Sequence, residues 1–429
     1  MQTKLTQQNI PNGWTPTKVG ELGFTYSGLR SKNKTDFGHG APFITYMNIF
    51  TNSKIDKNRF DLVDVDEEEN QSKVKYGDVF FTVSSETPEE VGMSSVLLDE
   101  VDNYYLNSFC FGFRLNGFNS LIPQYARYLF RGRDFRSKIM KMAQGSTRFN
   151  LSKDRVLSLD ITLPPIKEQQ KIAEIMGTVD EDIAKTQEVI EATERLKRGL
   201  MQQLFTRGIG HTKLKETKIG QIPEGWDFGG FKNLVNPDDK NAIKPGPFGS
   251  ALKKNFYVEK GFKIYGQEQV ISGDAFYGDY YVNEEKYKEM EGFKVNAGDI
   301  LISLVGTIGK ILIVPGNYEK GIINPRLLKI TPDSTKADSQ FIAHLLKSDF
   351  LIQQMSQKSH GGTMNILNKG MLMSVGFGVP PLKEQKEIAE ILSAVDEKIS
   401  INKKLKDKLN LLKKGLMQDL LSGKVRVNI

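Results

Sequence analysis

The chain has 429 residues, of which 39% are hydrophobic, so it can form two or three globular domains and is not a disordered polymer. A formal charge of +7 is compatible with a polyanionic partner but does not require one. The single cysteine, Cys110, excludes an internal disulfide framework. With no leader-like or membrane-spanning apolar run, the sequence predicts a cytoplasmic protein.

The first 160 residues alternate short apolar runs with turn residues, which predicts a strand-rich α/β domain. Ile10–Trp14 opens this region with a turn containing Pro and Gly. The run 42–47 reads as a strand, and a turn at 75–78 leads into a strand-like run at 79–85. The acidic stretch 61–69 is interpreted as solvated, because its carboxylates would repel DNA phosphates.

Basic residues dominate the segment 127–153, which reads as a helix followed by a loop at 145–150. Two interpretations stay open: a surface that faces phosphates, or an ordinary solvated helix face. The second repeat described below has fewer basic residues in this region. The residues are Arg127, Arg131, Arg133, Arg136, Lys138, Lys141, Arg148 and Lys153.

A long helix is predicted from the run Leu-Pro-Pro-Ile-Lys-Glu-Gln at 163–169 to about residue 207. A proline pair suits entry into a first turn, and Gly208 suits the stop. Apolar residues recur in a heptad phase along this helix, and Thr186 interrupts the row at its midpoint.

The second half of the chain repeats the first. Ile222–Trp226 matches the opening of the first domain, and 297–303 repeats its turn and strand. Val379–Gln385 then opens a second long helix, in which Ile388–Ile391 repeats Ile172–Ile175. The chain is therefore an internal duplication with a period of roughly 215 residues.

The charges of the two helices favour antiparallel pairing, because a parallel in-register pair would place like charges together. Matched midpoints would bring Glu174 towards Lys414, Asp180 towards Lys408, Thr186 opposite Asn402, Gly199 near Ala389 and Gly415 near Ala173. The residues predicted for the helix pair or for partner docking are Ile172, Val179, Thr186, Gly199, Leu200, Ile388, Val395, Asn402, Gly415 and Leu416.

The paired Pro-Pro-x-Lys-Glu-Gln runs, the paired domain openings and the run Gly246–Ser250 resemble the specificity subunit of type I restriction-modification systems over essentially the whole chain. The resemblance implies two target-recognition domains, residues 1–163 and 208–379. Spacer helices at 164–207 and 380–429 would separate them and form an antiparallel coiled coil.

The same resemblance implies a non-catalytic subunit that binds a bipartite, asymmetric site in double-stranded DNA. Two modification subunits would dock on its helices, and restriction subunits would complete the complex. S-adenosylmethionine, ATP and magnesium would then belong to the partner subunits and not to this chain. From helix length, the half-site centres would lie about one DNA turn, or roughly 10 base pairs, apart.

DNA-contact candidates are small and polar residues in loops, together with nearby basic residues, because these bind phosphates and base edges. The loops at 145–147 and 361–363 align with each other just before each long helix, although a plain turn explains them nearly as well. The candidates are Arg30, Lys32, Lys34, Ser84, Ser85, Thr147, Arg148, Asn150, Lys244, Ser250, Lys253, Lys254, Thr307, Arg326, Thr363 and Asn365.

No catalytic motif is recognised. The run Gly306–Lys310 has the wrong spacing for a phosphate loop, and the four histidines lack metal-ligand spacing, so no metal is expected. The proline pairs lack the neighbours of an adenine methyltransferase motif. Two alternatives stay open: a stand-alone DNA methyltransferase, and a coiled-coil scaffold without a DNA function.

Overall fold

The computed structural model describes residues 10–66, 68–145, 148–305, 307–358 and 368–428. The chain divides into two compact units. Unit 1 comprises residues 1–186 and 405–429, and unit 2 comprises residues 187–404. Both units include parts of the long helices α6 (Ile166–Arg207) and α12 (Leu382–Leu421).

Both long helices begin directly after a proline pair, as predicted. Gly208 follows the last residue of α6 with a φ of +63°, a conformation that stops a helix and favours glycine. The second helix ends at Leu421, and Gly423 follows two residues later with a φ of +69°.

Unit 1 is built on a four-stranded antiparallel sheet with the order β2-β9-β5-β7 and a three-stranded sheet with the order β4-β3-β8, in which β3 and β8 are parallel. Its elements before α6 are β1 (Thr15–Lys18), α1 (Val19–Leu22), β2 (Gly23–Ser27), η1 (Lys34–Asp36), β3 (Phe37–Ile44), α2 (Tyr46–Thr51), β4 (Phe60–Val63), β5 (Val79–Thr82), β6 (Ser84–Ser85), β7 (Ser94–Val96), β8 (Tyr105–Leu106), β9 (Cys110–Leu115), α3 (Pro123–Leu129), α4 (Arg133–Met142), β10 (Phe149–Asn150), α5 (Lys153–Leu157) and β11 (Asp160–Leu163).

Unit 2 repeats this plan with a four-stranded sheet of order β15-β23-β20-β21 and a five-stranded sheet of order β16-β18-β17-β22-β19. Its elements are β12 (Leu214–Thr217), β13 (Gly220–Pro223), β14 (Asp227–Gly229), η2 (Phe231–Asn233), β15 (Ile243–Pro245), η3 (Lys254–Phe256), β16 (Tyr257–Val258), β17 (Phe262–Tyr265), α7 (Gln267–Ser272), β18 (Tyr281–Val282), α8 (Glu284–Glu289), η4 (Glu291–Phe293), β19 (Lys294–Val295), β20 (Ile300–Ser303), β21 (Ile311–Ile313), β22 (Gly321–Ile323), β23 (Leu327–Ile330), α9 (Ser339–Leu346), α10 (Asp349–Lys358), α11 (Lys369–Ser374) and β24 (Phe377–Val379).

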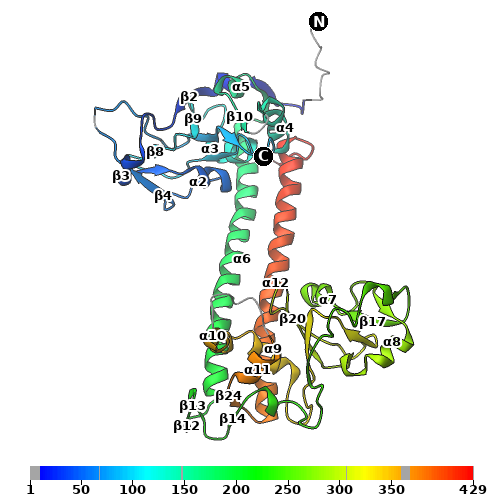
Figure 1. Ribbon diagram of the computed structural model, residues 1–429. Coiled ribbons are helices and arrows are strands. Elements are labelled where there is room, and N and C mark those ends of the chain that lie inside the picture. The colour runs from blue at the N-terminus through cyan, green and yellow to red at the C-terminus, as the bar shows by residue number, and fades with distance from the viewer. Residues whose placement is uncertain (1–9, 67, 146–147, 306, 359–367, 429) are drawn as a thin grey trace. The chain divides into compact units, whose positions relative to one another are not determined.

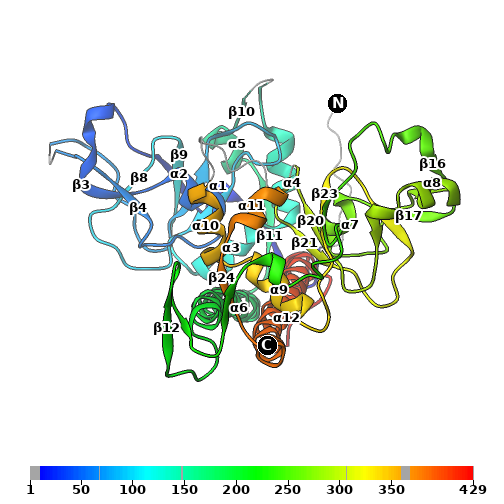
Figure 2. The same cartoon turned by 60° about the horizontal axis from the view of Figure 1, so that its bottom comes forward.

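The duplication predicted from the sequence is therefore a duplication of topology. The strands β2, β9, β5 and β7 correspond in order to β15, β23, β20 and β21, and the parallel pair β3–β8 corresponds to β17–β22. Within unit 1, α3 lies next to α6 while β3, β4 and β8 lie farther out (Figure 1). Within unit 2, β17 and α8 likewise lie on the far side of β20 from α12 (Figure 2).

Each core joins its sheet to the long helices. In unit 1, Phe81, Phe113 and Phe130 pack with Met176 of α6 and Leu420 of α12 in one buried cluster. Burying a large apolar side chain contributes about 1.5–3 kcal/mol. In unit 2, the corresponding cluster contains residues of the four-stranded sheet, α9 and both long helices. No helix within the described ranges is both long and apolar enough to cross a bilayer.

Two local predictions differ from the structure. The run 42–47 is a strand only as far as Ile44, because the Thr45 hydroxyl accepts a hydrogen bond from the Asn48 amide and so caps α2. The segment 127–153 contains two helices, α3 and α4, which are separated near Gly132.

Candidate nucleic-acid interface

The glutamate of the first Pro-Pro-x-Lys-Glu-Gln run binds the tryptophan that opens the domain. Glu168 is fully buried, and its Oε2 accepts a hydrogen bond from Trp14 Nε1 at 3.2 Å. Arg426 donates Nε to Oε1 at 2.7 Å and Nη2 to Oε2 at 2.8 Å. A buried carboxylate is tolerated only when it is paired in this way. The tryptophan of the domain opening and the glutamate of the Pro-Pro-x-Lys-Glu-Gln run therefore bind each other. We call this pair the anchor.

The second repeat builds the same anchor from different partners. Glu384 Oε2 accepts from Trp226 Nε1 at 2.8 Å, while Oε1 lies 2.9 Å from His211 Nε2 and accepts from the Ile209 amide at 3.0 Å. A methyl group at Gly208 would collide with this carboxylate and with the indole ring. Glycine is therefore required at this position for its small size as well as for its positive φ.

The glutamine of each run couples the helix start to a neighbouring helix. Gln169 donates to the carbonyl of Ser120 at 2.8 Å and accepts from the amide of Ile122, the N-cap of α3, at 3.1 Å. Gln385 accepts from the amide of Asp338, the N-cap of α9, at 3.0 Å. Both glutamines also donate to the first proline carbonyl of their run at 2.9 Å. These buried amides fix the direction in which each recognition domain leaves its helix.

One aspartate in each unit, at equivalent positions of the two repeats, links α6 to α12. In unit 1, Asp180 accepts from Lys413 Nζ at 2.6 Å, Arg127 Nη2 at 2.6 Å and the Tyr128 hydroxyl at 2.8 Å. In unit 2, Lys197 Nζ donates to Asp396 Oδ1 at 2.6 Å, and His344 Nδ1 lies 3.7 Å from Asp396 Oδ2. The two pairs join the duplicated aspartates to the duplicated lysines.

These contacts confirm the antiparallel pairing and correct its register. Asp180 meets Lys413 and not Lys408, and Lys403 bonds Glu194 at 2.7 Å. Matching the helix midpoints failed because exposed charge pairs contribute only tenths of a kcal/mol. The observed pairing is held instead by buried side chains, such as Met176 of α6 and Leu420 of α12, which pack in one core cluster of unit 1.

The predicted helix-pair residues differ in how far they are buried. Ile172 and Ile388 are fully buried and Val179 and Thr186 nearly so, while Leu200, Val395, Asn402 and Leu416 are half-buried. Gly199 and Gly415 are exposed, and a Cβ at either position would meet nothing within 4 Å. The expectation that they face Ala389 and Ala173 is therefore wrong, while docking of a partner on this face stays a prediction.

Several basic residues of the segment 127–153 are structural, which corrects both sequence-based interpretations for them. Arg131 donates to carbonyls 2.5–3.0 Å away on Ile49, Phe50, Asn52 and Ser94. Arg136 donates to carbonyls 2.6–2.8 Å away on Glu89, Val91 and Gly92. Burial lowers the pKa of both guanidinium groups to about 10. Both guanidinium groups therefore bind backbone carbonyls inside unit 1 and hold its loops in place.

An open cavity of about 350 Å³ lies on unit 1 where α2, β6 and the turn before β9 meet. Three predicted DNA-contact residues, Ser84, Ser85 and Arg148, line it, and Ser85 is largely buried. Sequence reasoning missed its apolar members. Met47 is 46% exposed and Phe109 is 61% exposed. Tyr46, Phe50, Glu86 and Glu90 complete the lining.

The matching surface of unit 2 is polar. Arg326 is exposed, and its Nη1 lies 3.5 Å from Gln267 Oε1. The Gln267 amide donates to the Val305 carbonyl. Thr307 is exposed beside this contact. Two predicted DNA-contact residues, Arg326 and Thr307, are therefore exposed in unit 2.

The other candidates have varied settings. Lys32 is an exception to the prediction of DNA contact, because its side chain is only 8% exposed and pairs with Glu69. Lys244 lies over the Phe293 ring, with its Nζ 5.0 Å from the centroid. Asn150 pairs with Ser84 in the β10–β6 ladder. Arg30, Lys34, Ser250, Lys253 and Lys254 are exposed, and Thr147, Thr363 and Asn365 lie outside the described residues.

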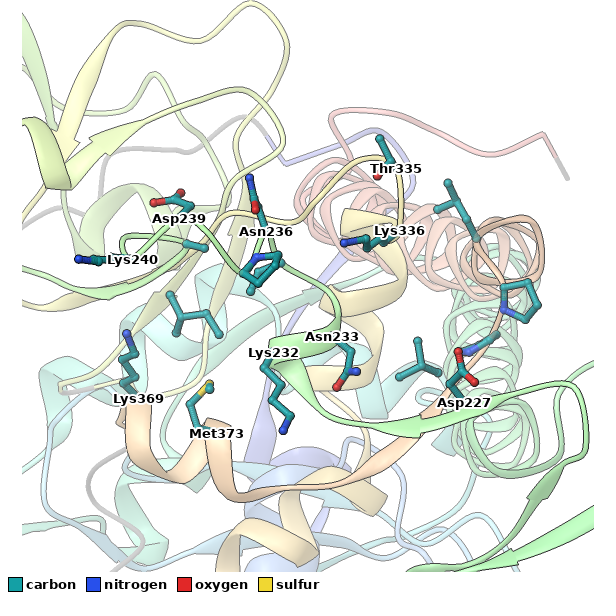
Figure 3. A pocket seen from close by; sticks show the side chains of 18 of the residues that line it. Asp227, Lys232, Asn233, Asn236, Asp239, Lys240, Thr335, Lys336, Lys369 and Met373 are labelled. Atoms are coloured by element: carbon teal, nitrogen blue, oxygen red, sulfur yellow. The ribbon is translucent and has the colours of Figure 1, made fainter.

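Unit 2 also has an open cavity of about 870 Å³ beside the start of α12, with a mixed polar and apolar lining (Figure 3). Lys369 and Met373 extend into it from α11, and Lys232 and Asn233 from η2. Its charged lining consists of Asp227, Lys232, Asp239, Lys240, Lys336 and Lys369. Lysines outnumber aspartates, so the cavity favours anionic groups. No predicted DNA-contact residue lines it.

Among the residues with described positions, no group of histidine, cysteine, aspartate and glutamate side chains could hold a metal ion. The lone Cys110 is buried, and burial raises the pKa of its thiol well above its ordinary value. A protonated, inaccessible thiol is a poor nucleophile.

Duplicated α/β units, anchored on paired helices and carrying different side chains on equivalent surfaces, define a protein with two recognition modules. The chain belongs to the type I restriction modification DNA specificity domain family, whose model matches residues 11–194 and 248–411. It is a type I restriction-modification specificity subunit with two DNA-recognition domains.

Known proteins are similar over most of the chain. The type I restriction enzyme MjaVIII specificity subunit of Methanocaldococcus jannaschii is 29% identical over 70% of this chain and 70% of its own. The type I restriction-modification S subunit of M. genitalium covers 100% of both chains with a TM-score of 0.55 at 17% identity. A chain from a study of complex assembly in a type I R-M system covers 97% of this chain and 100% of its own, with a TM-score of 0.59 at 17% identity. These two structures support the fold.

Proposed function

We propose that this chain reads a bipartite, asymmetric site in double-stranded DNA, one half-site with each recognition domain. The recognition domains would comprise residues 1–163 and 208–379, and the spacer helices residues 164–207 and 380–429. One observation carries the proposal: the two units share strand order and helix anchors but expose different side chains at their loops. A shared scaffold with different loops suits two different sequences.

The helices would dock the modification subunits, two per complex. This proposal rests on apolar side chains that the helices expose to solvent. In unit 2, Leu196 is 57% and Ile401 57% exposed, and in unit 1, Leu411 is 71% and Leu412 49% exposed. Exposed apolar rows of this kind mark interaction surfaces. Gly199 and Gly415 leave further open space on these helices.

The chemistry would belong to the partner subunits. Modification subunits would use S-adenosylmethionine to methylate adenine, and restriction subunits would use ATP and magnesium for cleavage. The chain itself would act as a non-catalytic subunit in the cytoplasm.

A binding measurement tests the proposal. The chain alone should bind its DNA weakly, and the complex with modification subunits should bind much more tightly, with affinity falling steeply as salt rises. The site is found by mapping modified adenines in cells that carry this chain and its modification subunits. Methyl transfer by the purified chain alone, or the absence of any sequence preference in the complex, would contradict the proposal.

A further inference from the structure

The backbone places Phe109 and Arg326 at equivalent positions of the two recognition domains. In unit 1, the Phe109 amide donates to Asn107 Oδ1 at 2.9 Å, directly after β8. In unit 2, the Arg326 amide donates to Asn324 Oδ1 at 2.9 Å, directly after β22. The backbone amides of Asn107 and Asn324 donate to the carbonyls of Ile44 and Tyr265, at 3.1 Å and 2.8 Å. Ile44 and Tyr265 are the last residues of the parallel neighbouring strands.

The carbonyls of the two residues confirm the equivalence. Phe109 O accepts from the Val83 amide at 3.0 Å, and Arg326 O accepts from the Leu304 amide at 2.9 Å. Val83 follows β5 and Leu304 follows β20, which are corresponding strands. The same turn therefore carries a phenylalanine in one domain and an arginine in the other.

The neighbours of this position change together with it. The first two residues of α2 are Tyr46 and Met47, and the first two of α7 are Gln267 and Glu268. Tyr46 Oη donates to the Ser84 carbonyl at 2.9 Å, and Gln267 Nε2 donates to the carbonyl of Val305 at the matching position. The scaffold contact is kept, while the residue at the centre of the turn differs. Phe109 is exposed next to Met47, on a surface that also carries Glu86, Glu90 and Arg148, whereas Arg326 is exposed next to Gln267.

These differences fit the chemistry of base edges. A guanidinium group can donate two parallel hydrogen bonds to guanine O6 and N7. An exposed phenyl ring beside a methionine offers no donor and instead suits the C5-methyl group of thymine. Exposed aromatic and thioether groups cost solvation in the free protein, and contact with a methyl group offsets this cost.

We infer that Phe109 and Arg326 are equivalent specificity-determining residues, which read a thymine methyl group in the half-site of unit 1 and a guanine edge in the half-site of unit 2. The inference rests on the proposed function and adds the chemical class of base that each domain takes. Met47 supports the apolar contact in unit 1, and Gln267 orients the guanidinium in unit 2.

The test uses the complete complex with its modification subunits and the mapped site. Each guanine is replaced in turn by 7-deazaguanine, which lacks the N7 acceptor. One replacement, in one half-site only, should weaken binding by about 10-fold or more for the native complex. The Arg326→Ala complex should be indifferent to the same replacement, and Arg326→Lys, which keeps the charge, should restore only part of the discrimination.

The matched experiment for Phe109 replaces each thymine by uracil, which removes only the methyl group. One replacement, in the other half-site, should weaken binding by about 4-fold for the native complex and not for Phe109→Ala. Lys260→Ala, an exposed charge removal in unit 2, should leave the ranking of all sites unchanged. Circular dichroism and complex assembly confirm that each variant is folded.

Three results would overturn the inference. The first is an Arg326→Ala complex that keeps its discrimination and binds all sequences more weakly by one factor, which is the signature of a phosphate contact. The second is that the deazaguanine and uracil effects fall in the same half-site, and the third is that they persist in the variants. Failure of the proposed function would look different, because the native complex itself would then modify no defined sequence.

Discussion

The two recognition units keep one anchor and complete it with different groups. Unit 1 surrounds Glu168 with an indole and a bidentate guanidinium, and the carboxylate is wholly buried. Unit 2 gives Glu384 an indole, an imidazole and a backbone amide, and leaves the carboxylate 12% exposed. The tryptophan and the glutamate of the anchor are therefore repeated, while the other groups that bind the glutamate differ between the two units. Removing the glutamate should therefore destabilise unit 1 more than unit 2.

The largest expected effect is that of Glu168→Ala. Removing this carboxylate leaves the Trp14 indole without a partner, while Arg426 stays bonded to the Asn12 carbonyl, and should destabilise unit 1 by about 3 kcal/mol. Glu384→Ala should cost unit 2 less, about 1–2 kcal/mol, because that carboxylate is already 12% exposed and its partner His211 is neither fully buried nor bidentate. Hydrogen exchange in the full chain, followed separately in each unit, measures both. Equal losses in the two units would contradict the comparison.

Acid should affect unit 2 selectively through His344. Burial, and then the nearby Lys197, lowers the pKa of this histidine to about 4, against roughly 6.5 in the unfolded chain. The unfolded state therefore binds the proton more readily, so stability is lost as pH falls from about 6.5 to 4 and is constant below that window. The loss attributable to His344 should be roughly 3 kcal/mol.

Unit 1 has Tyr128 in the corresponding place, bonded to Asp180, and no histidine to protonate there. Hydrogen exchange between pH 7 and 4 should therefore show a steeper decline for unit 2. His344→Gln supplies the control, since it should flatten the slope of unit 2 and leave unit 1 unchanged. A pH profile that the substitution does not alter would show that His344 is not the group responsible.

The smallest expected stability effect concerns the aspartates that link the helices. Asp180→Asn should destabilise unit 1 by about 1–3 kcal/mol, because three donors converge on a carboxylate that is 17% exposed. Asp396→Asn should cost unit 2 under about 1 kcal/mol, because that carboxylate is 40% exposed.

Thermal unfolding of the full chain gives the order of the two substitutions. Glu194→Gln, which breaks only the exposed pair with Lys403, is a control for a surface ion pair. A larger loss for Asp396→Asn than for Asp180→Asn would mean that the contacts of Asp396 stabilise the helix pair more than those of Asp180.

The sequence predicted what depends on repetition and local chemistry. Two copies of one motif revealed the duplication, and the proline pairs and Gly208 marked the helix ends. It did not give the helix register, because that depends on buried side chains of distant segments packing in one core, such as Met176 with Leu420. That the helices set the spacing of the half-sites stays a prediction.

The candidate site was predicted only in part, for a physical reason. A search for positive charge included Arg326 but also Lys32 and Arg131, because a sequence does not show which charges are neutralised or buried inside a domain. Phe109 was missed because an aromatic residue in a strand-rich region is usually core. Alignment of the two repeats around Asn107 and Asn324 is the signal that could have identified it.

The central claim is that each recognition domain reads its own half of the site. Its most direct test replaces residues 1–163 by the corresponding domain of a related specificity subunit and maps modified adenines across the genome. The account predicts that one half-site changes while the other keeps its sequence, and that replacing residues 208–379 does the reverse. A map in which either replacement changes both half-sites, in a complex that still assembles and methylates, would contradict it.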